Sequence, residues 1–400
     1  MDIYTPQTGM ESYPILIIYH GGGWLINTNA IMDSMSVYMV EYSELVVCNV
    51  NIRLLGDQSN TITINQIIED AMGALVWIKE HISTYKGDSK KIILTGDSSG
   101  GHLAAMVLLA GNDLESDGFE GTSLGYNPTY LPFRVTAEDL ASNNYLDVQG
   151  AILSYAAFDM YSSCLNGGFE TSSNIFWYLA AKSPRGLFGN EINVNDNPEY
   201  YLAVSPIYII PDASDRILPP QFCLVGSADN TVSPQSVQTY VDSCEQAGQV
   251  VEYWEYAGKP HAFLDSTPNA YLGTEFTRDA PPALDKMIEF INGIFFTTKI
   301  ESVDNHAKFN FKLHQNYPNP FNPSTKISYT VGTYHNGPLQ NVNLSIYNIS
   351  GQKVATLVNK YQPEGTYDIW WNASGVSTGV YIYQLQAGNY IETKKMILLQ

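Results

Sequence analysis

The stretch that most constrains the fold is a G-x-S-x-G motif between an apolar run, residues 92–94, and a helical pattern, residues 102–109. Between a strand and a helix, this motif forms a tight turn that lifts the serine hydroxyl clear of the sheet, and its two outer glycines are needed where strand and helix approach. Ser98 is therefore a candidate nucleophile. A glycine-rich loop without a catalytic role would have the same pattern, so the choice between the two interpretations depends on the rest of the chain. The motif comprises Gly96, Asp97, Ser98, Ser99, Gly100 and Gly101.

Apolar runs alternate with helical patterns through residues 1–297, which is typical of βαβ units around a mostly parallel sheet. Strands are expected at Tyr13–Tyr19, Leu45–Val50, Ile92–Leu94, Gln149–Tyr155, Gln221–Val225 and Val250–Tyr256. Helices are expected at Ile67–Ile82, Pro234–Ala247 and Pro282–Phe296. Two insertions, residues 111–146 and 160–215, leave from positions that flank the turn and are candidates for lids or pocket walls; for the first, surface decoration is an equal alternative. The fold class expected here is α/β, with a doubly wound open sheet.

The composition changes near residue 298. Residues 298–312 are polar and predict a linker, and residues 313–400 contain about six short alternating strands bounded by glycine, which predicts a small all-β sandwich. Residues 301–400 carry 7 Lys+Arg and 5 Asp+Glu, whereas the whole chain carries 20 and 40. The acidity therefore resides in the first part, and the two parts are expected to be separate domains.

The formal net charge of -20 argues against nucleic acid or an anionic membrane as a partner, because phosphates would be repelled. No run approaches the ~20 apolar residues of a membrane span, so no transmembrane segment is expected. The first residues lack the basic and apolar regions of a signal peptide. The four cysteines show no C-x-x-C spacing, and neither a metal nor a cofactor is expected.

A serine is a weak nucleophile unless a base takes its proton and a third group orients that base. Asp229 follows one predicted strand and His261 follows the next, so the order serine, acid, histidine is that of a hydrolase triad. The other histidines lie in the C-terminal part, on helices or in another motif. Asp159, after the Gln149–Tyr155 strand, is the alternative acid.

A glycine-rich loop follows the Tyr13–Tyr19 strand directly. Attack on an ester carbonyl creates an oxyanion that needs preorganised N–H donors, and glycines let the backbone approach it closely. Gly21, Gly22 and Ser99 are the expected donors. The loop consists of His20, Gly21, Gly22, Gly23 and Trp24.

These motifs resemble those of the carboxylesterases and lipases of the α/β-hydrolase superfamily that carry an H-G-G-G-W loop and a G-D-S-[AS]-G-G turn, a group that includes hormone-sensitive-lipase-like and feruloyl or acetyl esterase-like enzymes. The resemblance covers roughly residues 1–297 and implies hydrolysis of carboxylic esters without a cofactor. The family normally has further strands, and sometimes a cap, ahead of the residues seen here, so the resemblance implies either a truncated N-terminus or a miscalled start.

Residues 313–400 resemble the sorting domain of type IX secretion substrates from the Bacteroidetes lineage. The resemblance is carried by Asn316–Pro323, Ile346–Gln352, Gly379–Tyr381 and Lys394–Met396. It implies recognition by the type IX machinery and a secreted or cell-surface location, often with removal of this domain. Such substrates also need an N-terminal export signal, which this chain does not show.

The sequence thus predicts a secreted serine esterase in which Ser98 attacks, His261 transfers the proton and Asp229 orients His261. Its substrate would be a small-molecule or polysaccharide-linked ester. Two alternatives stay open: a peptidase or amidase of the same fold, and a non-catalytic surface binding protein on a hydrolase scaffold.

Overall fold

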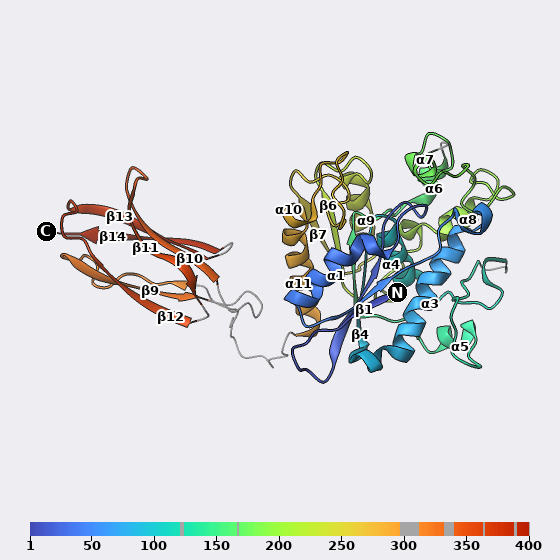
Figure 1. Cartoon of the computed structure of the whole chain (residues 1–400), viewed down its shortest axis with the longest axis horizontal. Coiled ribbons are helices and arrows are strands. Elements are labelled where there is room, and N and C mark those ends of the chain that lie inside the picture. Colours follow the sequence, from blue (N-terminus) through green and yellow to red (C-terminus); the bar gives the residue numbers. More distant parts are fainter. Residues whose placement is uncertain are drawn as a thin grey trace. The chain divides into compact units, whose positions relative to one another are not determined.

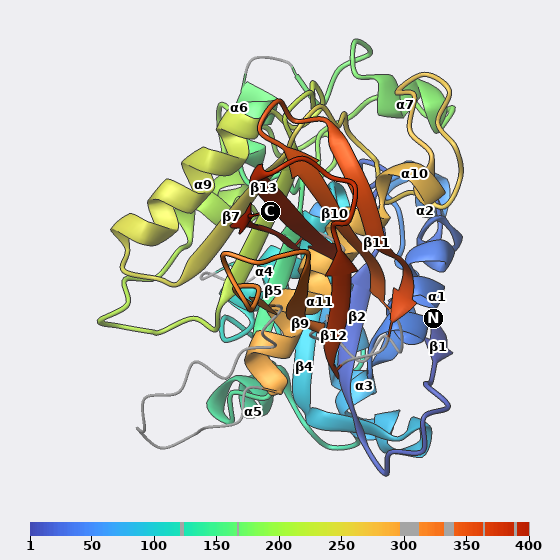
Figure 2. The same ribbon diagram turned by 90° about the vertical axis from the view of Figure 1, so that its left-hand side faces the viewer.

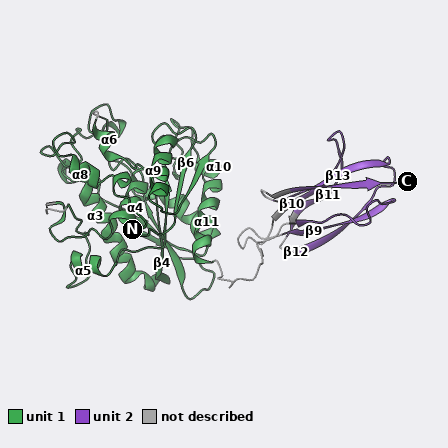
Figure 3. Cartoon of the chain, turned by 180° about the vertical axis from the view of Figure 1, so that it is seen from behind, with its two compact units in different colours: residues 1–298 green, residues 299–400 purple. Residues whose placement is uncertain are grey.

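The computed structural model describes residues 1–120, 124–165, 168–296, 312–331, 340–362, 365–387 and 390–399. The chain forms two compact units, Met1–Thr298 and Lys299–Gln400, which Figure 3 distinguishes by colour. Each unit buries its own apolar core. Of the predicted linker, residues 298–312, only Lys312 is among the described residues.

The first unit is built on a seven-stranded sheet of order β1-β3-β2-β4-β5-β6-β7. The strands are β1 (Asp2–Tyr4), β2 (Tyr13–Tyr19), β3 (Val46–Val50), β4 (Gly87–Asp97), β5 (Gly150–Ser154), β6 (Gln221–Gly226) and β7 (Val251–Tyr256). Only the pairing of β1 with β3 is antiparallel, and the other pairs are parallel. The predicted α/β class with a mostly parallel sheet is confirmed.

Helices cover both faces of this sheet. The long ones are α1 (Asp33–Tyr42), α3 (Ile64–His81), α4 (Ser99–Ala110), α9 (Pro234–Gln246) and α11 (Pro281–Phe295). Helices α1 and α11 lie on one face, and α3 and α4 on the other (Figure 1). Helix α9 packs on β6 and β7, at the far end of the sheet from β1 (Figure 2). Because both faces are covered, every residue of β2 is buried, which explains its unbroken apolar sequence.

The two insertions contain short helices. The first, residues 111–146, includes α5 (Ala137–Ser142), and the second, residues 160–215, includes α6 (Met160–Leu165), α7 (Ile175–Leu179) and α8 (Pro198–Ala203). Arg185 fastens the second insertion to the loop ahead of α3. Its guanidinium donates to the backbone carbonyls of Leu55, Asn60 and Ile62. The remaining short helices are α2 (Asp57–Asn60) and α10 (Phe276–Asp279).

The second unit is an all-β sandwich, as predicted. One sheet has the order β11-β10-β13-β14 and the other β12-β9-β8. The strands are β8 (Lys312–Leu313), β9 (Ser324–Val331), β10 (Gln340–Asn348), β11 (Lys353–Gln362), β12 (Gly365–Asn372), β13 (Gly379–Ala387) and β14 (Tyr390–Leu398). The sequence did not predict β8, which is only two residues long. Within the described parts of the chain, none of the helices combines the length and apolar character needed to cross a membrane.

Candidate active site

Ser98 stands at the turn between β4 and α4. Its backbone has φ 53° and ψ -119°, a conformation that side chains rarely adopt, and its N–H donates to the carbonyl of Ser154 at 2.9 Å. The turn has no room for larger residues: a Cβ on Gly96 would lie 2.3 Å from the carbonyl carbon of Gly100, and one on Gly100 would lie 2.0 Å from the carbonyl oxygen of Tyr19. These close approaches hold the serine hydroxyl at the carboxyl end of β4.

His261 lies between Ser98 and Asp229. Its Nδ1 is 2.7 Å from Asp229 Oδ2, and its Nε2 is 3.0 Å from Ser98 Oγ. A carboxylate can only accept, so Nδ1–H donates to Asp229 and Nε2 is left to accept the Ser98 hydroxyl proton. All three side chains are nearly enclosed, with Ser98 8% and His261 6% exposed. The structure therefore brings together the three residues that the sequence grouped.

Backbone hydrogen bonds join the loops that carry the acid and the histidine. Ala228 N–H donates to the carbonyl of Lys259 at 3.0 Å, and Gly258 N–H donates to Ser227 Oγ at 2.7 Å. The free oxygen of Asp229, Oδ1, accepts from the N–H groups of the two residues Thr231 and Val232. Asp229 is thus held both by its own loop and by its neighbour.

The alternative acid, Asp159, is placed elsewhere. Its carboxylate accepts from Ser162 N–H and from the hydroxyl of Tyr208, and it stabilises the start of α6. His102, inside α4, is also apart from Ser98, because its Nε2 donates to the carbonyl of Val204 at 2.9 Å. Burial lowers the pKa of His102 to about 4, so this ring stays neutral.

The glycine loop lies against the turn, but one expectation about it is wrong. Gly21 N–H donates to Asp97 Oδ1 at 2.7 Å, so it cannot also bind a substrate oxygen. By contrast, the N–H groups of Gly22 and Gly23 have no acceptor among the described residues. Ser99 is the first residue of α4, so its N–H is not used inside the helix. The free donors at this edge are those of Gly22, Gly23 and Ser99.

The sequence singles out Asp97 only as a member of the motif. In the structure its buried carboxylate binds the glycine loop through Gly21 N–H. Burial raises the pKa of Asp97, while nearby His261 and the N–H of Gly21 act in the opposite direction. Asp265 lies close by, and burial together with the charge of Asp97 raises its pKa as well. Tyr155 lies beside the same site, because its ring packs edge-on against His261 with 4.7 Å between ring centroids. No sequence motif signalled Asp265 or Tyr155.

The second insertion forms a wall beside the glycine loop. Phe169 packs edge-on against Trp24 with 5.4 Å between ring centroids. A Cβ on Gly23 would lie only 2.6 Å from Cγ of Phe176. The first half of this insertion, which carries Phe169 and Phe176, therefore lies as a wall beside the glycine loop, one of the roles that the sequence predicts for it.

Comparison with known proteins agrees with this geometry. Residues 1–242, more than half of the chain, match the family model described as BD-FAE. The chain belongs to the BD-FAE family. Residues 315–399 match a second model, described as a secretion system C-terminal sorting domain. The resemblances that the two sets of motifs predicted are therefore confirmed.

Relatives of this BD-FAE chain are named as esterases. It is 28% identical to esterase LipQ of Mycobacterium tuberculosis and 22% identical to isoprenylcysteine alpha-carbonyl methylesterase ICME of Arabidopsis thaliana. Each match covers 66% of this chain and 54% of the relative, so the chain spans about half the length of the curated relatives it matches. A propionate-bound thermophilic esterase from Thermogutta terrifontis shares the fold, with TM-score 0.51, 20% identity, and coverage of 75% of this chain and 90% of that one.

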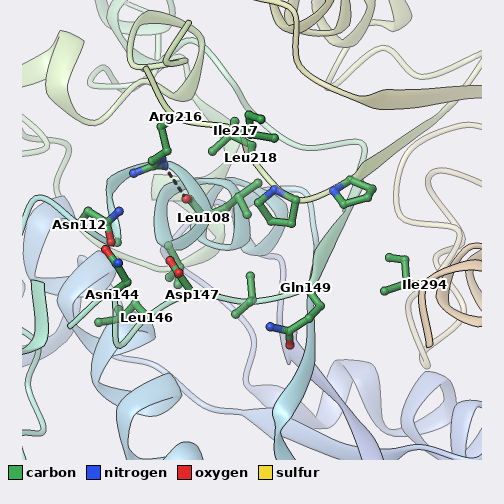
Figure 4. Close-up of a pocket in the computed structure, with 15 residues that line it drawn as sticks. Leu108, Asn112, Asn144, Leu146, Asp147, Gln149, Arg216, Ile217, Leu218 and Ile294 are labelled. Atoms are coloured by element: carbon green, nitrogen blue, oxygen red, sulfur yellow. Dashed lines mark hydrogen bonds between the residues drawn. The ribbon is translucent and has the colours of Figure 1, made fainter. Parts of the chain in front are cut away.

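The cavity in Figure 4 lies apart from the candidate site of the BD-FAE domain. It has a volume of about 630 Å³ and is lined by residues that end α4 or precede β5 and β6, such as Leu108, Gln149 and Leu218. Arg216, on its wall, already donates to the carbonyls of Leu108 and Leu109. Ser98 stands at the carboxyl end of β4, whereas this cavity opens where β5 and β6 begin. We therefore do not assign the chemistry to it.

Proposed function

We propose that this chain is an exported serine hydrolase of carboxylic esters. The observation that carries the proposal is His261, placed between Ser98 Oγ at 3.0 Å and Asp229 Oδ2 at 2.7 Å. A serine activated by a base, with the base oriented by a carboxylate, is the arrangement that acyl transfer requires. The two relatives described above are named as esterases, which favours an ester over another acyl substrate.

In the first half of the reaction, Ser98 Oγ bonds to the ester carbonyl carbon and its proton passes to His261 Nε2. The carbonyl oxygen becomes an oxyanion. When this tetrahedral intermediate collapses, the bond to the alcohol oxygen breaks, and the alcohol leaves with the proton from His261. Ser98 then carries the acyl group.

In the second half, water attacks the acyl carbon and gives a proton to His261 Nε2. Collapse releases the carboxylic acid, and Ser98 Oγ recovers its proton from His261. Asp229 keeps Nδ1 protonated throughout and stabilises the charged imidazole, since Oδ2 accepts from Nδ1 while Oδ1 is satisfied by backbone amides.

We assign binding of the oxyanion to the N–H groups of Gly22, Gly23 and Ser99. Those of the two glycines have no acceptor among the described residues, and that of Ser99 lies in the first turn of α4. Loss of one such donor typically costs ~3 kcal/mol of transition-state stabilisation. Asp97 acts indirectly, because its carboxylate holds Gly21 and thereby the start of the loop.

The second unit supplies the export half of the proposal. Its match to a secretion system sorting domain indicates a secreted or cell-surface protein. We assign its recognition to type IX machinery through residues 313–400, and the substrate to small-molecule or polysaccharide-linked esters met outside the cell.

The test is turnover of p-nitrophenyl acetate by the full chain and by Ser98→Ala. The control is Ser83→Ala, an exposed serine that precedes β4 and so lies at the opposite end of that strand from Ser98. We expect Ser98→Ala to lose roughly 10⁶-fold in kcat, and the control to lose nothing. A fluorophosphonate probe should label the wild type and the control but not Ser98→Ala.

Three results would contradict the proposal in different ways. Undiminished turnover by Ser98→Ala would exclude this serine as the nucleophile. Faster cleavage of p-nitroanilides than of esters would indicate a peptidase or amidase. Absence of both labelling and turnover in the folded wild type would indicate a binding protein.

A further inference from the structure

Phe176 is held over the glycine loop by its own helix. It is the second residue of α7, and its N–H donates to the side chain of Asn174, which caps that helix. A Cβ on Gly23 would lie 2.6 Å from Cγ of the Phe176 ring and 2.8 Å from both Cδ atoms. These nearly equal distances mean that the ring covers the α-carbon of Gly23.

The rest of α7 explains why Phe176 stays there. Trp177 is 1% exposed, and its Nε1–H donates to the carbonyl of Phe169 at 2.8 Å, which anchors the helix to the preceding segment. Ile175, Tyr178 and Leu179 face outward, and Tyr178 is 78% exposed. Phe176 is thus the side chain of this helix that is directed at the glycine loop.

The sheet order decides which part of an ester would meet this ring. Asp229 and His261 follow β6 and β7, on one side of β4, whereas the glycine loop follows β2, on the other side. The alcohol oxygen must approach His261 to receive its proton, so the alcohol lies on the β5 to β7 side. The carbonyl oxygen faces the free N–H groups. The acyl substituent takes the remaining direction at the tetrahedral carbon, and we place it past the oxyanion donors, beside Gly23 and Phe176.

We propose that Phe176 closes the acyl side of the site and restricts this chain to esters of short acyl groups, of acetyl to butyryl size. This inference rests on the proposed function, because it concerns the same serine and the same histidine. The ring packs on Gly23 of the oxyanion loop, and in this proposal it occupies the space that a longer acyl chain would need beside the loop. The near enclosure of Ser98 and His261 agrees with a small acyl space.

The experiment compares kcat/KM for p-nitrophenyl acetate, butyrate and octanoate in the full chain, in Phe176→Ala and in the control Tyr178→Ala, which truncates an outward-facing ring of the same helix. We expect the wild type to prefer acetate to octanoate, and Phe176→Ala to reduce that preference by roughly tenfold or more, since one methylene in a tight pocket already changes kcat/KM about tenfold. Tyr178→Ala should keep the wild-type ratio.

The acyl-length ratio separates a specificity role from a structural one. Loosening of the loop alone would lower kcat/KM for all three esters by the same factor and would overturn the proposal, as would an equal change of the ratio in both variants. If Phe176→Ala does not fold, Phe176→Leu replaces it and must reduce the preference to a smaller extent. An active wild type with an unchanged ratio in the variants refutes only this inference, whereas a wild type inactive on every ester refutes the proposed function itself.

Discussion

Asp229 is the residue whose contacts are most completely assigned in the site. Its Oδ2 accepts from His261, and its Oδ1 accepts from the amides of Thr231 and Val232. An asparagine would keep the shape but would present an N–H₂ group or a weaker acceptor to Nδ1, which favours the wrong imidazole tautomer. The role proposed for Asp229 is therefore to orient and stabilise the imidazole, and an isosteric change can isolate it.

We expect Asp229→Asn to lower kcat for p-nitrophenyl acetate by about 10³- to 10⁴-fold with little loss of stability. The matched control is Asp159→Asn, at the other strand end that the sequence offered for the acid. Since Asp159 contacts Ser162 and Tyr208 and not His261, its variant should retain wild-type kcat. Equal losses in the two variants would argue against Asp229 as the orienting group.

Among the elements, α3 carries a buried acid that lies outside the site. Glu69 is 9% exposed, and its Oε1 accepts from Asn127 N–H in the first insertion at 3.2 Å. Burial raises the pKa of Glu69 from 4.5 to about 7, while the amide of Asn127 opposes the shift. In the unfolded chain the carboxyl loses its proton near its ordinary value, so the folded state binds more protons between these two values.

The free energy of unfolding should therefore fall as the pH rises from about 4.5 to about 7, through the contribution of Glu69. Glu69→Gln keeps an acceptor for Asn127 N–H but cannot ionise. We expect this variant to exceed the wild type in urea unfolding by roughly 1–3 kcal/mol at pH 8, and to match it closely near pH 4.5. Glu41→Gln, on the exposed end of α1, serves as control, and a gain that is independent of pH would contradict the explanation.

At the scale of the whole molecule, the two units divide the proposed tasks. All residues assigned to catalysis lie within Met1–Thr298, and each unit has a separate core. A chain ending at residue 298 should therefore hydrolyse p-nitrophenyl acetate with kcat/KM within about twofold of the full chain, since domains with their own cores fold independently. In the native host, the same truncation should keep the enzyme out of the culture medium. A truncated protein that is folded but inactive would show that the second unit contributes to the site.

The sequence predicts most strands of the sheet and the three residues of the candidate triad, because periodicity and glycine spacing are local signals. The bounds of β2 were predicted to the residue, and the order of Ser98, Asp229 and His261 followed from strand ends. Contacts between distant segments were not predictable. The sequence predicts Gly21 as an oxyanion donor because nothing in it shows that this amide faces Asp97, 76 residues away. Likewise, Phe176 is one aromatic among many until the fold places its ring on Gly23.

The hydrogen bonds between the loops after β6 and β7 have a consequence for how such an enzyme can change. The loops of the acid and the base are joined to each other and follow the neighbouring strands β6 and β7, and the nucleophile stands on the turn after β4 in the same sheet. Phe176 instead comes from an insertion between β5 and β6, anchored by its own Trp177 and Arg185. In the proposed function, reactivity and substrate range thus depend on separate segments of the chain, so that mutation of the insertion can change the substrate range while the triad is kept.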